Sequence, residues 1–118
     1  MTDQPSGALS GIKIIDMTSV VFGPLATQML GDLGADVIKV ESPEGDMLRQ
    51  VQPAQSPGMG AAFLGANRNK RSIVLDLKTP DGREQLLALL VDADVFVSSI
   101  RPAALARLSL DPETLRAL

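Results

Sequence analysis

Three cations lie within four residues in the segment 67–71, whose sequence is NRNKR. Arg68, Lys70 and Arg71 are close enough to bind separate oxygens of a polyphosphate, because guanidinium and ammonium groups form strong hydrogen bonds with phosphate oxygens. A run of charges is also typical of a solvated face. The segment therefore leaves two alternatives open, a polyphosphate contact and an ordinary exposed surface.

The turn 18–24 reads TSVVFGP and follows an apolar stretch. A dinucleotide-binding turn carries three glycines in a G-x-G-x-x-G pattern, whereas this turn has Gly23 followed by Pro24. The mismatch disfavours NAD binding. The Gly-Pro pair alone is consistent with a plain connection and with a role in a site.

The residue types that are missing exclude several chemistries. The chain has no cysteine and no histidine, so a thiolate nucleophile, a His-based triad and a His- or Cys-ligated metal site are excluded. Asp16 and Asp76 lie within expected strands, either solvated or paired with a nearby cation. No pair of carboxylates has the spacing of an acid/base couple. The pairs 45–46 and 81–82, Gly-Asp and Asp-Gly, indicate a turn and a helix start.

Composition indicates one globular domain in 118 residues, with 45% apolar residues. Aromatic residues make up 3% and the net charge is −3, which disfavours nucleic-acid binding. Residues 1–10 form a polar lead without the pattern of a signal peptide. No apolar run approaches the ~20 residues of a membrane span. We therefore expect no membrane contact and a cytoplasmic location.

The strands and helices that must position these side chains alternate along the chain. Apolar segments at 11–17, 36–40, 72–77 and 94–98 predict strands. Apolar stripes predict helices over 24–33, 80–91, 102–108 and 112–118, with Pro24, Thr79, Pro80 and Asp111 in first-turn or capping positions and Gly34 after the first helix. Residues 42–69 are expected to form a long loop, with a possible short helix at 59–64.

This alternation predicts an α/β fold with a Rossmann-like, mainly parallel sheet and helices on both faces. In such sheets, ligands bind at the carboxyl ends of the strands. Here those ends fall at 18–23, 41–45, 77–80 and 98–101. Lys78, Arg101 and Arg107 lie near two of these ends, which favours a phosphate contact over general solvation.

Several long, ordered blocks carry a family resemblance. They are LSGIKIIDM at 9–17, GP at 23–24, LGADVIKVE at 33–41, GDMLR at 45–49, NRNKRSIVLDLK at 67–78 and ADV at 93–95. The chain resembles, from residue 9 to residue 118, the N-terminal segment of the family III CoA-transferases, which include formyl-CoA transferase, carnitine CoA-transferase and alpha-methylacyl-CoA racemase.

The resemblance implies that residues 11–118 form the N-terminal part of a larger Rossmann-like domain that binds coenzyme A. It implies that Val20 and Val21 contact CoA and that Leu77 and Lys78 hold its adenine end. Ser99, Ile100 and Arg107 should lie near the nucleotide and pantetheine. Two departures stand out: Ser42-Pro43 replaces a phosphate-binding Arg of many members, and Ser99-Ile100 replaces a usual Asn-aromatic pair.

The resemblance also implies an activity that these residues alone do not perform. In the transferases, an aspartate attacks the acyl-CoA thioester to form a covalent anhydride, and CoA passes between organic acids. In the racemases, a His and an Asp act at the α-carbon. No residue here matches either motif, so no catalytic residue is assigned and we expect the chain to be inactive alone, as a fragment, a truncated form or one part of a split protein.

Three functions stay open: a transferase segment, a racemase segment and a non-catalytic CoA- or nucleotide-binding or assembly module. The expected ligands are an acyl-CoA and a carboxylic acid acceptor, with no metal. The expected partner is a second copy of the chain, interlocked as in the family, or a complementary chain.

Overall fold

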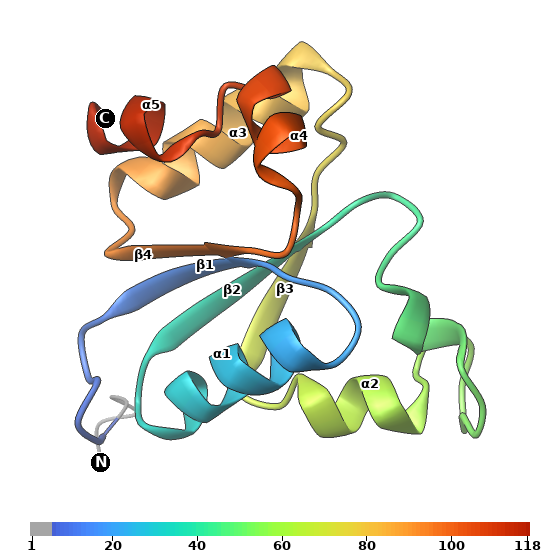
Figure 1. Cartoon of the computed structure of the whole chain (residues 1–118). Coiled ribbons are helices and arrows are strands. Elements are labelled where there is room, and N and C mark those ends of the chain that lie inside the picture. The colour runs from blue at the N-terminus through green and yellow to red at the C-terminus, as the bar shows by residue number, and fades with distance from the viewer. Residues whose placement is uncertain (1–5) are drawn as a thin grey trace.

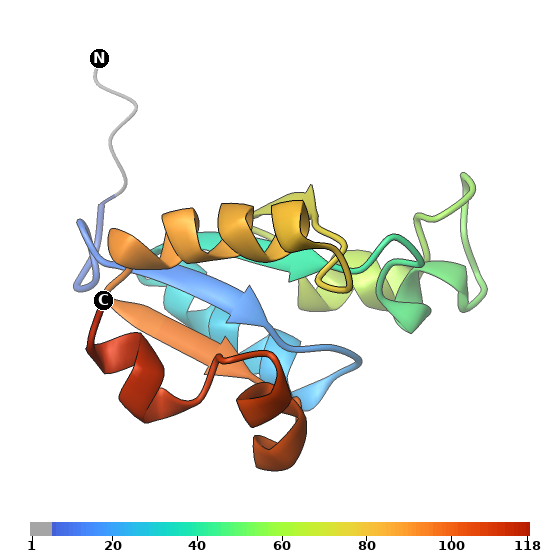
Figure 2. The same ribbon diagram turned by 90° about the horizontal axis from the view of Figure 1, so that it is seen from above.

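Four strands form one sheet in the computed structural model of this chain, which describes residues 6–118 (Figure 1). Residues 1–5 of the expected polar lead lie outside the described residues. The strands are β1 (Lys13–Met17), β2 (Asp36–Glu41), β3 (Lys70–Val74) and β4 (Val95–Ser98), in the order β3-β2-β1-β4. Every neighbouring pair is parallel, and the arrowheads point to one side of the molecule (Figure 2). The predicted α/β, Rossmann-like class is confirmed.

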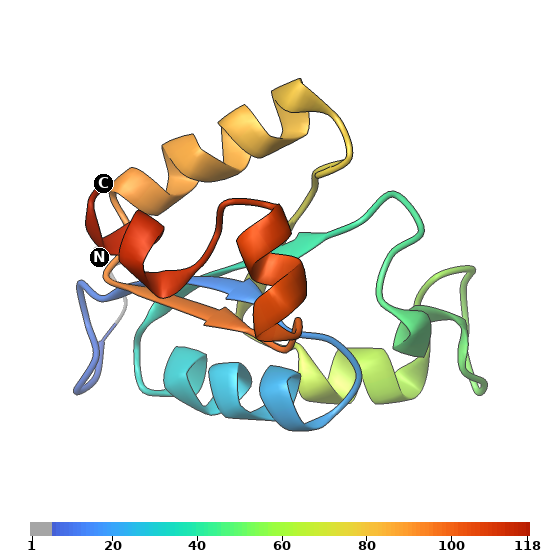
Figure 3. The same ribbon diagram turned by 45° about the horizontal axis from the view of Figure 1, so that its top comes forward.

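Helices cover both faces of this sheet, as predicted (Figure 3). On one side lie α1 (Phe22–Asp32) and α2 (Ala61–Ala66); on the other lie α3 (Pro80–Val91), α4 (Pro102–Arg107) and α5 (Pro112–Arg116). Among residues 6–118, no helix has the length and apolar character needed to cross a bilayer.

The core is divided by the sheet, because successive side chains of a strand point to opposite faces. Ile15 packs with the helices of the α3 side, in a cluster that includes Met17, Val40, Leu75, Leu86, Leu90 and Leu110. Ile14 faces the α1 side, where it packs with Ala35 and Val37. Both isoleucines are fully buried.

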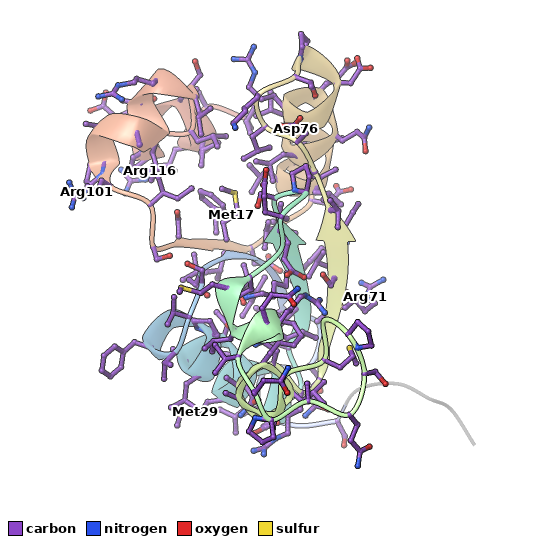
Figure 4. The ribbon with its side chains drawn as sticks, turned by 90° about the vertical axis from the view of Figure 1, so that its right-hand side faces the viewer. Met17, Met29, Arg71, Asp76, Arg101 and Arg116 are labelled. Atoms are coloured by element: carbon purple, nitrogen blue, oxygen red, sulfur yellow. The ribbon has the colours of Figure 1, made fainter. Side chains whose placement is uncertain are left out.

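Most of the apolar stripe predicted for α1 does not pack against the sheet, although Leu30 contacts the cluster of Ile14, Ala35 and Val37. Leu25, Met29 and Leu33 are exposed, and Met29 lies on the outer side of the helix (Figure 4). Thr27 and Gln28 are buried instead. Thr27 Oγ1 donates to the carboxylate of Asp16 at 2.6 Å, so a polar contact beneath the helix sets its orientation.

The third strand ends earlier than predicted. β3 covers residues 70–74 rather than 72–77, and Leu75 N adds one further bond to Glu41 O at 2.9 Å. The chain then turns, with Asp76 Oδ1 accepting from Lys78 N at 3.0 Å. Asp76 is therefore a turn residue. Leu77 and Lys78 lie in the connection to α3, outside the strand.

The capping predictions are confirmed. Thr79 Oγ1 accepts from Gly82 N at 3.0 Å and Pro80 is the first residue of α3. Asp111 accepts from Thr114 N at the start of α5. Gly34 follows α1 with a φ of +105°, a conformation that glycine adopts at low cost.

The segment 42–69 is more ordered than predicted. It contains a 3-10 helix, η1 (Met47–Gln50), in addition to α2, which begins two residues later than the expected 59–64 helix. Leu48 and Phe63 are buried, and the Arg49 guanidinium lies 3.9 Å from the centre of the Phe63 ring. Arg49 also pairs with Glu41 at 2.7 Å, which ties the segment to the carboxyl end of β2.

Candidate ligand-binding site

A cavity of about 610 Å³ lies at the carboxyl ends of the strands. Its walls come from all four strand ends and from α4, at residues 17–19, 39–47, 75–78, 99–100 and 108. This is the edge at which open α/β sheets bind ligands, and the volume is within the ~300–1,000 Å³ typical of ligand pockets. It is the strongest candidate site among the described residues.

Four of the seven residues expected to contact CoA line this cavity: Leu77, Lys78, Ser99 and Ile100. Val20 and Val21 are exposed on the β1–α1 turn and directly follow Ser19, which lines it. Arg107 is exposed on α4, next to the lining residue Leu108. The fold therefore brings the four lining residues together and leaves the other three outside the walls.

Three charged residues beneath the cavity were not singled out from the sequence as a group. Lys39, Glu41 and Asp46 line it, yet their side chains are buried. The sequence does carry a signal for two of them. Lys39 and Glu41 interrupt an otherwise apolar strand, and a charge in a strand covered on both faces needs a buried partner.

The cation run 67–71 does not form a polyphosphate site. Each of its cations has a carboxylate partner: Arg68 with Asp32 at 2.8 Å, Lys70 with Asp16 at 2.9 Å and Arg71 with Asp36 at 2.7 Å. The run leads into the amino end of β3, whereas the cavity is at the carboxyl ends. Arg71 lies on β3, apart from Arg101, which precedes α4, and from Arg116 on α5 (Figure 4).

The exposed cations near the cavity differ from those of the run 67–71 in having no carboxylate partner in the described part of the chain. Among residues 6–118, neither Lys78 nor Arg107 has a carboxylate within salt-bridge distance. Lys78 is exposed at the cavity wall, and its charge contributes to the lowered pKa of Glu44, after that residue's own hydrogen bonds. An ammonium group without a close partner is available to an anionic ligand.

Asp16 shows how strongly the interior below the cavity is charged. It lies within β1, fully buried, and pairs with Lys70, whose side chain is also buried. Burial by itself raises the pKa of the Asp16 carboxyl, but hydrogen bonds from Thr18, Thr27 and Lys70 outweigh burial and hold the pKa below its usual range. Of the two alternatives open for Asp16, the ion-pair partner is the one observed.

Glu41 is held by an equally dense set of donors. Arg49 donates from Nε at 2.8 Å and from Nη2 at 2.7 Å, Asp46 N donates at 2.8 Å, and Ser72 Oγ also donates. Burial opposes ionisation of Glu41, yet these hydrogen bonds lower its pKa to about 2. The carboxylate is therefore ionised and fully occupied, which leaves it no role as a proton acceptor.

We expect part of the acid sensitivity of this chain to come from Glu41. Its pKa falls from 4.5 to about 2 on folding, so folding favours the ionised form. The resulting stability is present above pH 4.5 and is lost as the pH falls toward 2, by as much as ~3 kcal/mol. Urea unfolding followed by circular dichroism from pH 7 to pH 2 measures it.

The control for this pH dependence is Glu41→Gln. The variant should be less stable than the parent at pH 7 but should lose less stability between pH 4.5 and pH 2. Parallel curves for the two proteins over that interval would contradict the assignment to Glu41.

No group of three or more acidic, histidine or cysteine side chains in residues 6–118 is arranged to hold a metal ion. The cavity combines the exposed ammonium of Lys78, the carboxylates of Glu44 and Asp76, apolar side chains and backbone turns at the ends of parallel strands. A cavity at this edge of the sheet is typical of the ligand sites of open α/β proteins.

The chain belongs to CoA-transferase family III, whose family model matches residues 9–118. The predicted family resemblance is confirmed.

Named relatives agree with this assignment. A probable fatty acyl-CoA transferase of Mycobacterium tuberculosis is 42% identical over 98% of this chain and 30% of its own length. A succinate–glutarate CoA-transferase of Agrobacterium fabrum is 47% identical over the whole of this chain and 32% of its own length. A crystal structure of a CaiB/BaiF family protein from Brucella suis superposes with a TM-score of 0.89 at 41% identity, over 95% of this chain and 31% of that one. The chain thus spans about a third of the length of these relatives.

Proposed function

We propose that this chain is the CoA-binding segment of a family III CoA-transferase that transfers CoA between carboxylic acids. The observation that carries the proposal is the cavity at the strand ends, where Lys78 forms no ion pair within residues 6–118 and apolar side chains share the walls with Glu44 and Asp76. CoA presents phosphates, an adenine ring and a long pantetheine arm, which suit a cationic edge and apolar walls. The two relatives described as transferases, from Mycobacterium tuberculosis and Agrobacterium fabrum, support transfer over racemisation.

In this proposal each part of CoA has a complementary surface. The ammonium of Lys78 binds a phosphate, and the side chains of Leu77 and Ile100 cover the adenine. Val20 and Val21 contact CoA from the β1–α1 turn. Ser99 and Arg107 lie beside the nucleotide and pantetheine, with Arg107 reaching the ligand from the rim.

The covalent step of the proposed reaction takes place on an aspartate that this chain does not supply. A carboxylate oxygen attacks the thioester carbonyl carbon, the carbon–sulfur bond breaks, CoA leaves as a thiolate, and a mixed anhydride remains. Asp16, Glu41 and Asp46 are buried and held by cations, so none of them is available as this nucleophile. The role of this chain is to hold CoA while the reaction proceeds.

Charge reversal at Lys78 tests the proposal. Lys78→Glu should weaken CoA binding by about tenfold or more, because hydrogen bonds to charged groups contribute ~1.5–3 kcal/mol. Calorimetric titration of the chain with CoA measures the change. In the assembled enzyme, the same variant should raise KM for acyl-CoA with a smaller effect on kcat.

Arg116→Glu is the matched control, because it makes the same change of charge on α5, outside the cavity walls. It should leave CoA affinity within about twofold. If both reversals weaken binding equally, the effect is one of net charge and the assignment of Lys78 is wrong. Arg107→Glu should weaken CoA binding more than Arg116→Glu and less than Lys78→Glu, since Arg107 lies at the rim of the cavity.

The dimer implied by the resemblance belongs to the same proposal. The exposed side chains of Phe22, Leu25 and Met29 along α1 support it, because large apolar patches commonly mark protein interfaces. Light scattering on the chain and on the assembled enzyme measures the oligomeric state. A location in the cytoplasm is likewise proposed.

A further inference from the structure

A buried ion pair joins the loop after β2 to the turn after β1. Lys39 Nζ lies 3.0 Å from Asp46 Oδ2, and each side chain is 1% exposed. The same ammonium donates to the carbonyl oxygen of Thr18 at 3.0 Å. Lys39 thus anchors the first residue of the β1–α1 turn from below.

Asp46, the other member of the pair, contacts the same turn at Val20, two residues after Thr18. The Asp46 carboxylate accepts from Val20 N, with separations of 3.3 and 3.4 Å to its two oxygens. One ion pair therefore holds both a carbonyl and an N–H group of this turn, one through its cation and the other through its anion.

Val20 needs such support, because its backbone is strained. Its φ is +73°, a conformation that a β-branched side chain rarely adopts. Strained residues persist where the surrounding contacts determine the backbone, and they concentrate at ligand sites. The Asp46 carboxylate is the acceptor that the described residues offer to the Val20 N–H.

Asp46 is itself fixed from two directions. Its N–H donates to Glu41 Oε1 at 2.8 Å, at the end of β2, and its Oδ1 accepts from Leu48 N at 3.0 Å, at the start of η1. The carboxylate therefore cannot follow the turn if the turn moves. It transmits the position of β2 and η1 to Val20.

We propose that Lys39 and Asp46 are positioning residues that set the β1–α1 turn for CoA. The proposal rests on the proposed function in one respect, the contact of Val20 and Val21 with CoA. Both side chains are buried at the cavity wall, and in this proposal they act through the backbone of residues 18–20. An ion pair suits this role because each buried charge needs its partner, which restricts the pair to one geometry.

The test uses Lys39→Met and the double variant Lys39→Met/Asp46→Asn. The single variant leaves the Asp46 charge buried without its partner, which destabilises the fold, whereas the double variant removes that unpaired charge. Both variants lose the hydrogen bond from Lys39 to the carbonyl oxygen of Thr18. Arg71→Met is the control, because it removes the cation of an ion pair with Asp36 that shares no hydrogen bond with residues 18–20, Lys39 or Asp46.

Two readouts are needed. Amide hydrogen exchange at Val20 in the chain without ligand reports the anchoring of the turn, and calorimetric titration with CoA reports its consequence. In the double variant we expect Val20 exchange to accelerate by about tenfold or more relative to the core amides of β1, and CoA affinity to fall about tenfold, as expected for loss of a hydrogen bond to a charged group. Arg71→Met should change neither the relative exchange rate of Val20 nor the affinity for CoA.

The outcomes separate this inference from the proposed function. Unchanged Val20 exchange in the double variant overturns the anchoring. Faster exchange with unchanged CoA affinity overturns the positioning role and leaves the proposed function intact. Recovery of full CoA affinity in the double variant, after its loss in Lys39→Met, shows that the pair serves stability alone. If the parent chain and the assembled enzyme both fail to bind CoA, the proposed function and the positioning role fail together, and exchange still decides the anchoring.

Discussion

Replacing Lys70 with methionine is expected to lower the free energy of unfolding by about 3–5 kcal/mol. The variant keeps most of the side-chain volume but removes the cation 2.9 Å from Asp16, which is fully buried. A carboxylate left unpaired in the interior is far more costly than the loss of a surface pair. Urea unfolding followed by far-ultraviolet circular dichroism measures the change, since the chain has no tryptophan for fluorescence.

The neighbouring cation provides the control. Arg71→Met breaks an ion pair with Asp36 whose two side chains are 68% and 39% exposed. Exposed pairs contribute ~1 kcal/mol or less, so this variant should change stability by no more than that. Similar losses at residues 70 and 71 would contradict the distinction between the buried and the exposed pair.

Gly82→Ala is expected to destabilise the fold by ~3 kcal/mol or more, beyond the usual range for overpacking. A β-carbon at this position would lie 1.9 Å from the carbonyl oxygen of Asp76 and 2.6 Å from its carbonyl carbon. These are backbone atoms, so α3 and the loop that carries Leu77 and Lys78 must separate. We expect CoA binding to weaken together with stability, as measured by urea unfolding and calorimetric titration.

Gly65→Ala is the matched substitution in another helix. A β-carbon there meets nothing within 4 Å. Alanine has the higher helix propensity, so this variant should raise stability by up to ~1 kcal/mol. A mild effect at residue 82, or a comparable loss at residue 65, would show that the close approach of α3 to Asp76 is not what requires glycine.

Element order and capping could be predicted because they depend on neighbours in the sequence. Thr79-Pro80 and Asp111-Pro112 each begin a helix through bonds within four residues. The end of β3 could not be predicted in this way. The apolar residues Leu75 and Leu77 continue the pattern of a strand, but the chain turns at Asp76 so that α3 can pack over the sheet.

The orientation of α1 could not be predicted from the spacing of its apolar residues either. Its apolar residues predict a buried face, yet the helix turns Thr27 and Gln28 inward. Their partners are distant in sequence: Thr27 donates to Asp16, and Gln28 Oε1 accepts from Arg68 N at 2.9 Å. A polar contact set by residues far along the chain thus decided which face is buried.

For the site, the sequence by itself determined the class of fold, the family and the edge of the sheet that holds the cavity, because the alternation of strands and helices and the helix caps depend on neighbours in the sequence. Tertiary structure alone decided which charges are free. Arg68, Lys70 and Arg71 resemble a phosphate-binding run until folding gives each a carboxylate. Lys78, an isolated cation in the sequence, is left at the cavity without one. Coulombic partners depend on distance in space, and only the packed sheet brings Asp16, Asp32 and Asp36 close to the first group while leaving Lys78 without an ion pair among the described residues.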